Sequence, residues 1–136
     1  MSQRVSGHAI IRERSRVPIQ MGENWCEPTD MERALQVGAS DLAMIDAMKI
    51  GGVTGWLRAA SLAQTAGIPV SSHIFQEVSV HLLAVTPTAH WLERMDLAGP
   101  ILAMPTAFAD GHAQCPRDPG IGIEWNEEAV QKYRLV

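Results

Sequence analysis

Short, almost wholly apolar runs alternate with amphipathic segments up to about residue 95, and this alternation constrains the fold most. Four runs are predicted as strands, at residues 17–21, 42–45, 68–71 and 89–93. A strand that is apolar at every position needs cover on both faces, which a parallel sheet flanked by helices provides. The sequence therefore predicts an α/β fold with about four parallel strands.

The segments between the runs carry helical patterns. Thr29 or Asp30 is placed to cap a helix that ends near Gly38. Two apolar stripes at helical spacing predict further helices, one stopped by Gly67 and one ending near Pro87. The stripes consist of Trp56, Ala59, Ala60 and Ala63 in the first helix, and of Val78, Leu82 and Val85 in the second.

The chain changes character beyond this region. Prolines and glycines recur between residues 99 and 122, which predicts loops and short extended pieces. We therefore divide the chain into a sheet-and-helix unit over 1–95 and an irregular tail over 96–136 that packs on it. A length of 136 residues suits a single domain.

Charge and composition exclude several classes of partner. Lysine and arginine total 11 against 15 acidic residues, so the net charge of -4 offers no basic surface for nucleic acid. No stretch approaches the roughly 20 apolar residues of a membrane span, and the N-terminus lacks the apolar core of a secretory signal. We expect a cytoplasmic protein without nucleic-acid or membrane partners. Cys26 and Cys115 lie too far apart in sequence for a CxxC motif, and we expect neither a disulfide scaffold nor a structural zinc site.

An ionisable residue lies at the carboxyl end of each apolar run. These residues are Glu23, Asp46, His73 and Glu93, at spacings of 23, 27 and 20. One such residue alone is more often a helix cap or a solvated loop residue. Four in succession predict a functional site, because α/β sheets and barrels place their chemistry at the carboxyl ends of the strands.

Four longer stretches carry more information than the spacing. They are GENW at 22–25, DAMKIGGVTGW at 46–56, SSHIFQE at 71–77 and TPTAHWLERMDLAGP at 86–100. Together they closely resemble the C-terminal half of the mandelate racemase subgroup of the enolase superfamily. The resemblance implies the last four strands of a (β/α)7β barrel over 1–95, with the tail over 96–136 packing on the barrel or its capping region. It also implies Mg2+-assisted abstraction of the proton α to a carboxylate.

The resemblance assigns a role to each strand-end residue. Glu23 is expected to be one of three carboxylate ligands of Mg2+. His73 resembles the general base and Asp46 its carboxylate partner, at a position where the cycloisomerase-like branch carries a lysine. Glu93 resembles the protonated acid that donates a hydrogen bond to the substrate carboxylate as it becomes an enediolate. Ile74 follows the base directly and is expected to contact the substrate.

The implied activity leaves three alternatives. Racemisation of a 2-hydroxy acid is the first, dehydration of an acid sugar is the second, and a noncatalytic truncated half-barrel is the third. The resemblance places the other metal ligands and a lysine base on strands that this sequence does not supply, so we expect the chain to be inactive alone. Strands cut from a closed barrel leave unpaired edges, which predicts self-association or pairing with a complementary N-terminal half. Lys49 and Cys26 are expected to have structural roles.

Overall fold

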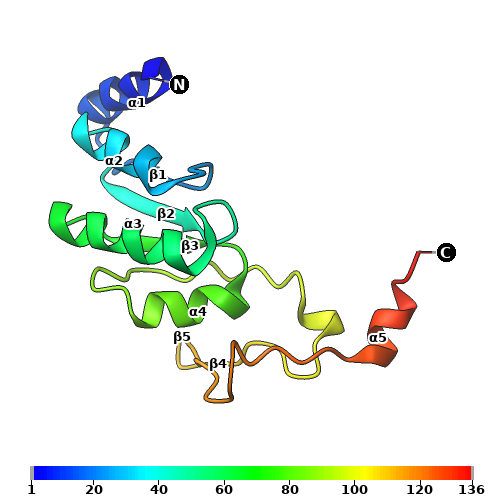
Figure 1. Ribbon diagram of the computed structural model, residues 1–136. Helices are drawn as coiled ribbons and strands as arrows, with labels where there is room; N and C mark the ends of the chain where they lie inside the picture. The colour runs from blue at the N-terminus through cyan, green and yellow to red at the C-terminus, as the bar shows by residue number, and fades with distance from the viewer. Residues whose placement is uncertain (1, 136) are drawn as a thin grey trace.

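The computed structural model describes residues 2–135, with side chains from Val5 onward. Three parallel strands form its main sheet in the order β1-β2-β3, and helices alternate with them (Figure 1). In chain order the elements are α1 (Ser2–Arg14), β1 (Gln20–Met21), α2 (Pro28–Gln36), β2 (Leu42–Asp46), α3 (Gly52–Ala66), β3 (Val70–His73), α4 (Gln76–Ala84), the short 3-10 helix η1 (Gly99–Ile101), β4 (Phe108–Ala109), β5 (His112–Ala113) and α5 (Glu127–Lys132). The predicted α/β class with parallel strands is confirmed.

Strand β1 is shorter than the predicted run over 17–21, because the residues before it form other hydrogen bonds. Pro18 has no amide hydrogen to give to a ladder. The amide of Ile19 donates to the carboxylate of Asp41 at 2.8 Å instead of to the backbone of β2. Only two residues therefore pair regularly with β2.

The run predicted as a fourth strand, at residues 89–93, follows β3 without becoming a regular strand. The amide of His90 donates to the carbonyl oxygen of Val70 at 2.8 Å, next to one isolated parallel bridge. Further along, the amide of Glu93 donates to the hydroxyl of Ser72 at 3.0 Å, so a side chain replaces the backbone ladder there. The prediction of four strands is corrected to three strands and a parallel bridge.

The helices agree with the sequence on the buried stripe of α3 and differ at the start of α2. All four predicted stripe residues of α3 are buried, and Gly67 ends this helix in the left-handed conformation. Helix α2 begins at Pro28, whose missing amide hydrogen costs nothing in a first turn. The predicted cap at Thr29 or Asp30 is wrong, because Glu27 holds the cap position and makes no side-chain cap bond.

The predicted stripe on α4 is only partly correct. Leu82 is buried as expected, but Val85 lies just past the end of the helix and is 62% exposed. Gln76 and Ser79 are buried in this helix although both are polar. The Ser79 hydroxyl is paired with the carbonyl oxygen of Ile74 at 3.0 Å, and burial of this serine is therefore compensated.

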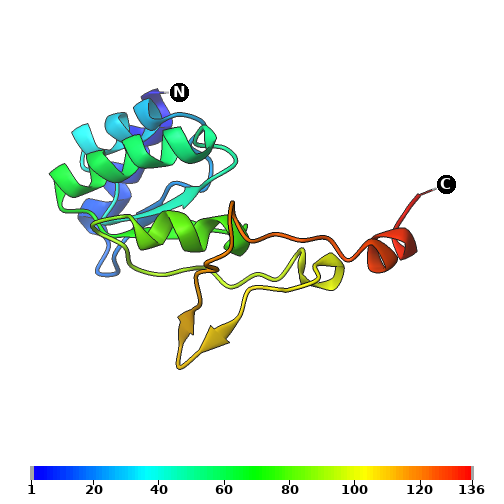
Figure 2. The ribbon, with the colours of Figure 1, turned by 60° about the horizontal axis from the view of Figure 1, so that its bottom comes forward.

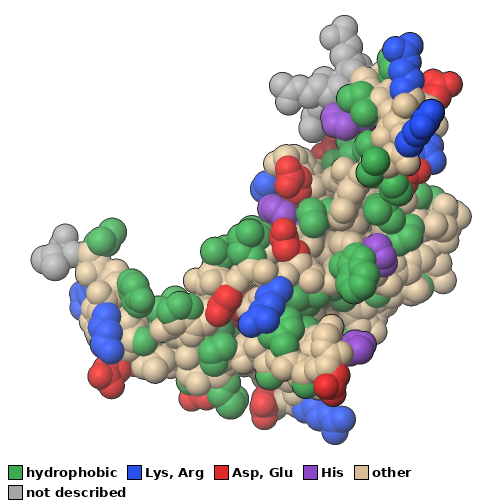
Figure 3. Space-filling model, turned by 180° about the vertical axis from the view of Figure 1, so that it is seen from behind, with side chains coloured by type: hydrophobic (Ala, Val, Ile, Leu, Met, Phe, Trp, Pro, Cys, Tyr) green, Lys and Arg blue, Asp and Glu red, His purple; other side chains and the backbone are tan. Residues whose placement is uncertain are grey.

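The tail leaves the sheet and its helices and ends far from them (Figure 1, Figure 2). Its antiparallel β4–β5 hairpin projects from the body of the molecule in Figure 2. Its contacts with the rest of the chain include hydrogen bonds that join His81 of α4 to Cys115 and Ile121, and a cation–π contact between Arg94 and Phe108. Hydrophobic side chains are spread over the face seen from behind in Figure 3. None of the described helices is both long and apolar enough to cross a membrane.

Candidate active site

The carboxyl ends of the three strands meet at one edge of the sheet and carry three of the predicted site residues. Asp46 is the last residue of β2 and His73 the last residue of β3, and the two are paired in the parallel register. Glu23 follows β1 by two residues. Glu93 reaches the same edge from the segment beside β3, since its carboxylate contacts the backbone directly after His73. The structure therefore brings all four residues together.

Asp46 and His73 form the best-defined contact of the site. Oδ2 of Asp46 lies 3.0 Å from Nδ1 of His73, as predicted. The Asp46 side chain is only 1% exposed, and its other oxygen accepts hydrogen bonds from the amides of Met48 at 2.8 Å and Lys49 at 3.1 Å. An ionised carboxylate can only accept, so Nδ1 of His73 carries the proton of this bond. Nε2 of His73 is then the nitrogen that can take up a proton.

Glu23 lies on the Nε2 side of the imidazole. Its Oε2 is 3.6 Å from Nε2 of His73, and its side chain is 56% exposed. Oε1 of Glu23 accepts a hydrogen bond from Nδ2 of the Asn24 side chain at 3.2 Å. Oδ1 of the same side chain accepts a hydrogen bond from Nζ of Lys49 at 3.0 Å. A chain of hydrogen bonds thus orients Glu23. Lys49 was predicted to have a structural role, whereas Asn24 was not predicted, because only its position next to Glu23 in the sequence pointed to it.

The turn that carries Glu23 requires glycine. Gly22 has a φ of +136°, and a Cβ built there would lie 2.5 Å from the carbonyl oxygen of Met44 in β2. A side chain at this position would push the turn away from the sheet edge. Gly22 therefore sets the distance between Glu23 and the end of β2.

Glu93 holds the loop that follows His73. Its Oε2 accepts from the amide of Ile74 at 2.7 Å. Ile74 and Phe75 have φ values of 41° and 46°, a region that is costly for side chains of this size. Backbone strain of this kind persists only where surrounding contacts hold it. Here the backbone N–H of Ile74 donates to Glu93, and its carbonyl oxygen accepts from the Ser79 hydroxyl. The loop is therefore fixed between the base candidate His73 and the acid candidate Glu93.

The described residues do not by themselves make a metal site. Within residues 2–135 no group of three or more histidine, cysteine, aspartate or glutamate side chains is arranged to hold a metal ion. Glu23 can offer one carboxylate, whereas Mg2+ favours six oxygen ligands in near-octahedral geometry. Further protein ligands would have to come from outside the described chain.

Comparison with known proteins identifies the family of the chain and solved structures with a similar fold. The sequence model of the Enolase C-terminal domain-like family matches residues 1–129. The crystal structure of an enolase from Bradyrhizobium, complexed with magnesium and mandelic acid, is similar with 51% identity and a TM-score of 0.92, over 100% of this chain and 37% of that chain. A Streptomyces coelicolor racemase with bound magnesium is similar with 29% identity and a TM-score of 0.89, over 97% of this chain and 36% of its own.

A curated relative carries out a different reaction. D-gluconate dehydratase of Thermoproteus tenax is 33% identical, in an alignment that covers 96% of this chain and 28% of the relative. The chain thus spans about a third of the length of the proteins it matches. The family match confirms both the predicted superfamily and the predicted part of a (β/α)7β barrel.

Proposed function

The chain belongs to the Enolase C-terminal domain-like family, and from this premise we propose that it supplies the histidine half of an active site that abstracts the proton α to a carboxylate. The observation that carries the proposal is the 3.0 Å contact between His73 and the buried Asp46. A carboxylate behind an imidazole fixes its tautomer and stabilises the imidazolium that forms when the base takes up a proton.

Each site residue has a part in the proposed reaction. Nε2 of His73 removes the α proton, and Asp46 stabilises the resulting positive charge. Glu93, in its protonated form, donates from Oε1 to the substrate carboxylate, because Oε2 is already engaged by the Ile74 amide. The charge that develops on the enediolate is thereby met by a positioned donor. The Ile74 side chain, which directly follows the base in sequence, contacts the substrate.

Magnesium does not fit the described residues alone. Glu23 is placed to give one oxygen ligand, and the described part of the chain offers no set of three candidate ligands. We therefore propose that Mg2+ is shared with a complementary N-terminal half that carries the remaining ligands, and that this chain is inactive without it.

Racemisation of a 2-hydroxy acid is the reaction we propose first. It is supported by the 51% identity to the Bradyrhizobium enolase whose structure holds magnesium and mandelic acid. Dehydration of an acid sugar is the second candidate, supported by the 33% identity to a D-gluconate dehydratase. The same histidine and aspartate could deliver a proton to a leaving hydroxyl in that reaction.

The decisive experiment combines this chain with the part of the Bradyrhizobium enolase that it does not cover. In deuterated water with Mg2+, we expect the mixture to exchange the α proton of mandelate, followed by NMR, while either half alone does not. His73→Asn should abolish exchange, and His90→Asn is the matched control, since His90 lies outside the proposed site. Parallel assays with D-gluconate would show a 2-keto acid if the dehydratase alternative holds. A mixture that co-purifies and binds Mg2+ but performs neither reaction would contradict both candidates and leave the noncatalytic half-barrel.

A further inference from the structure

A second group of polar side chains lies away from the sheet edge, where the tail meets α4. Sγ of Cys115 is 3.2 Å from Nδ1 of His81, and Nε2 of His81 is 3.0 Å from the carbonyl oxygen of Ile121. A backbone carbonyl can only accept, so the contact with Ile121 places a proton on Nε2 of His81. The lone pair of Nδ1 then faces the Cys115 thiol. The arrangement is a nucleophile, a base and a group that orients the base.

We propose that Cys115 is a site of covalent modification by small disulfides, with His81 as the base that removes its thiol proton. The resulting thiolate attacks one sulfur of the disulfide, a new bond joins that sulfur to Sγ, and the old sulfur–sulfur bond breaks. The leaving thiolate takes the proton back from His81. One disulfide and one thiol are consumed and one of each is formed, so the exchange needs no further oxidant.

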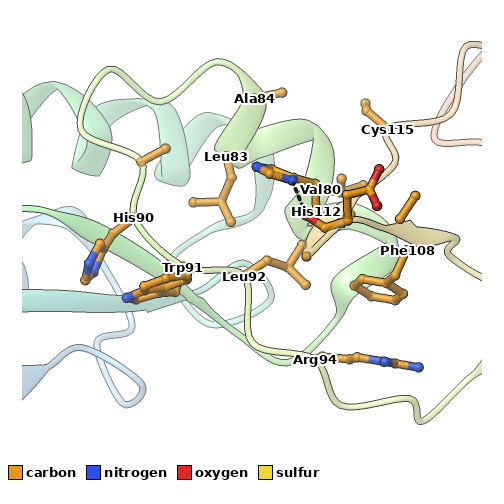
Figure 4. Close-up of a pocket in the computed structure, with 15 residues that line it drawn as sticks. Val80, Leu83, Ala84, His90, Trp91, Leu92, Arg94, Phe108, His112 and Cys115 are labelled. Carbon is orange, nitrogen blue, oxygen red and sulfur yellow. Dashed lines mark hydrogen bonds between the residues drawn. The ribbon is translucent and has the colours of Figure 1, made fainter.

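The surroundings of Cys115 leave room for such a reagent. The Cys115 side chain is exposed and lies at the edge of a cavity of about 610 Å3 (Figure 4). Leu83 of α4 and Phe108 of the tail supply apolar walls, and the guanidinium of Arg94 lies 4.5 Å from the centre of the Phe108 ring. This volume lies in the range of small-molecule pockets. A small disulfide with apolar parts matches these walls.

The other cysteine provides an internal comparison. Cys26 is also exposed, but the contact of its sulfur is with the carbonyl oxygen of Asn24 at 3.8 Å. A carbonyl oxygen cannot remove a thiol proton at neutral pH. The two thiols therefore resemble each other in exposure and differ in the neighbouring base.

The test measures disulfide exchange on the full chain with dithiobis-nitrobenzoate. A free thiol is only a few per cent ionised near neutrality, so we expect Cys115 to react about tenfold faster than Cys26. Cys115→Ser should remove the fast phase and Cys26→Ser the slow one. His81→Gln should slow the fast phase to the rate of Cys26 and leave the Cys26 phase unchanged. Equal rates for the two cysteines, or a fast phase that survives His81→Gln, would overturn the proposal.

A second condition separates base catalysis from a structural effect of His81. At about pH 10 thiols ionise without help, so the rates of the wild type and His81→Gln should converge. A deficit that persists there would mean that His81 only positions Cys115, and the proposal would fail.

A measurement without variants uses glutathione disulfide and peptide mapping of the wild-type chain. Adducts mainly on Cys115 support the proposal, whereas equal or greater labelling of Cys26 contradicts it.

Discussion

Both carboxylate oxygens of Asp46 are engaged, one by His73 and one by two backbone amides. In Asp46→Asn an amide group can face Nδ1 of His73 as a donor, which favours a proton on Nε2 instead. We expect nitrogen NMR of the neutral imidazole to show Nδ1–H in the wild type and a shift toward Nε2–H in the variant. His90 serves as a reference in the same spectra. When the variant is mixed with the N-terminal part of the Bradyrhizobium enolase, the rate of α-proton exchange should fall at least about tenfold. Removing a residue that orients a functional histidine typically lowers activity by this much. An unchanged His73 tautomer in the variant would contradict the proposed role of Asp46.

Asp41, which lies outside the site, should make the free energy of unfolding depend on pH in the acid range. The Ile19 amide and the Arg12 guanidinium, which lies 2.7 Å from Oδ1, hold the pKa of the Asp41 carboxyl below 3.8. A carboxyl whose pKa is lower in the folded state stabilises that state above its unfolded pKa and loses the effect as pH falls through the folded value. Asp41→Asn should lower the free energy of unfolding by about 1 kcal/mol near neutrality.

Urea denaturation at several pH values checks this dependence. The difference between the wild type and Asp41→Asn should shrink below about pH 4, where Asp41 begins to lose its charge in the unfolded chain. Asp118→Asn, at an exposed position in the tail, is the control and should change little at any pH. A difference for Asp41→Asn that stays constant down to pH values where both states are protonated would mean that the charge is not what stabilises the fold.

The contacts of the site could be predicted from the sequence only where they follow from strand register. Asp46 and His73 end neighbouring parallel strands, so their contact follows once the strands are placed. The link from Lys49 through Asn24 to Glu23 depends on how two loops fold over the edge, and no periodicity encodes it. The left-handed conformation of Ile74 was also beyond the pattern, because it is imposed by tertiary contacts against local preference.

At the level of helices, α3 packs so closely against the turn that precedes it that no side chain fits at Gly55. A Cβ at this position would overlap the carbonyl oxygen of Ile50, whereas a Cβ at Gly7 in α1 would meet nothing within 4 Å. Gly55→Ala should therefore lower the free energy of unfolding by about 3 kcal/mol through overpacking. Gly7→Ala, a matched helical glycine, should be neutral or raise it by up to about 1 kcal/mol. Urea titration measures both, and equal effects would mean that the backbone of α3 shifts freely.

The same elements explain where sequence patterns succeeded and failed. Helix α3 has an apolar stripe, a glycine stop and a buried tryptophan, all of which point to one answer. The ends of the strands do not follow from the pattern, because side chains there form hydrogen bonds with backbone groups. The Asp41 carboxylate accepts a hydrogen bond from the backbone amide of Ile19 before β1. The Ser72 hydroxyl accepts one from the backbone amide of Glu93, after the isolated bridge to β3. Polar side chains that act on the backbone across 20 or so residues leave no local pattern to read.

At the scale of the whole molecule, the sheet has edges that its own chain covers only in part. On one side β1 pairs with β2 over two residues. On the other side, residues 88–91 follow β3 with three backbone hydrogen bonds and one isolated bridge, without forming a regular strand, and Trp91 is 67% exposed. Unpaired strand edges and exposed apolar side chains favour association with another chain.

We therefore propose that the chain on its own self-associates, most simply as a symmetric dimer, and that a complementary N-terminal half would displace the second copy. Burial of apolar surface is worth roughly 25 cal/mol per Å2, so covering exposed side chains such as Trp91 and Met95 favours either partner. Sedimentation velocity at micromolar concentration should show a species heavier than the 14.8 kDa monomer. Trp91→Ser should shift it toward the monomer, whereas Tyr133→Ser, a similarly exposed aromatic residue near the C-terminus, should not. A compact wild-type monomer that unfolds cooperatively would show that α4 and the tail already close the core.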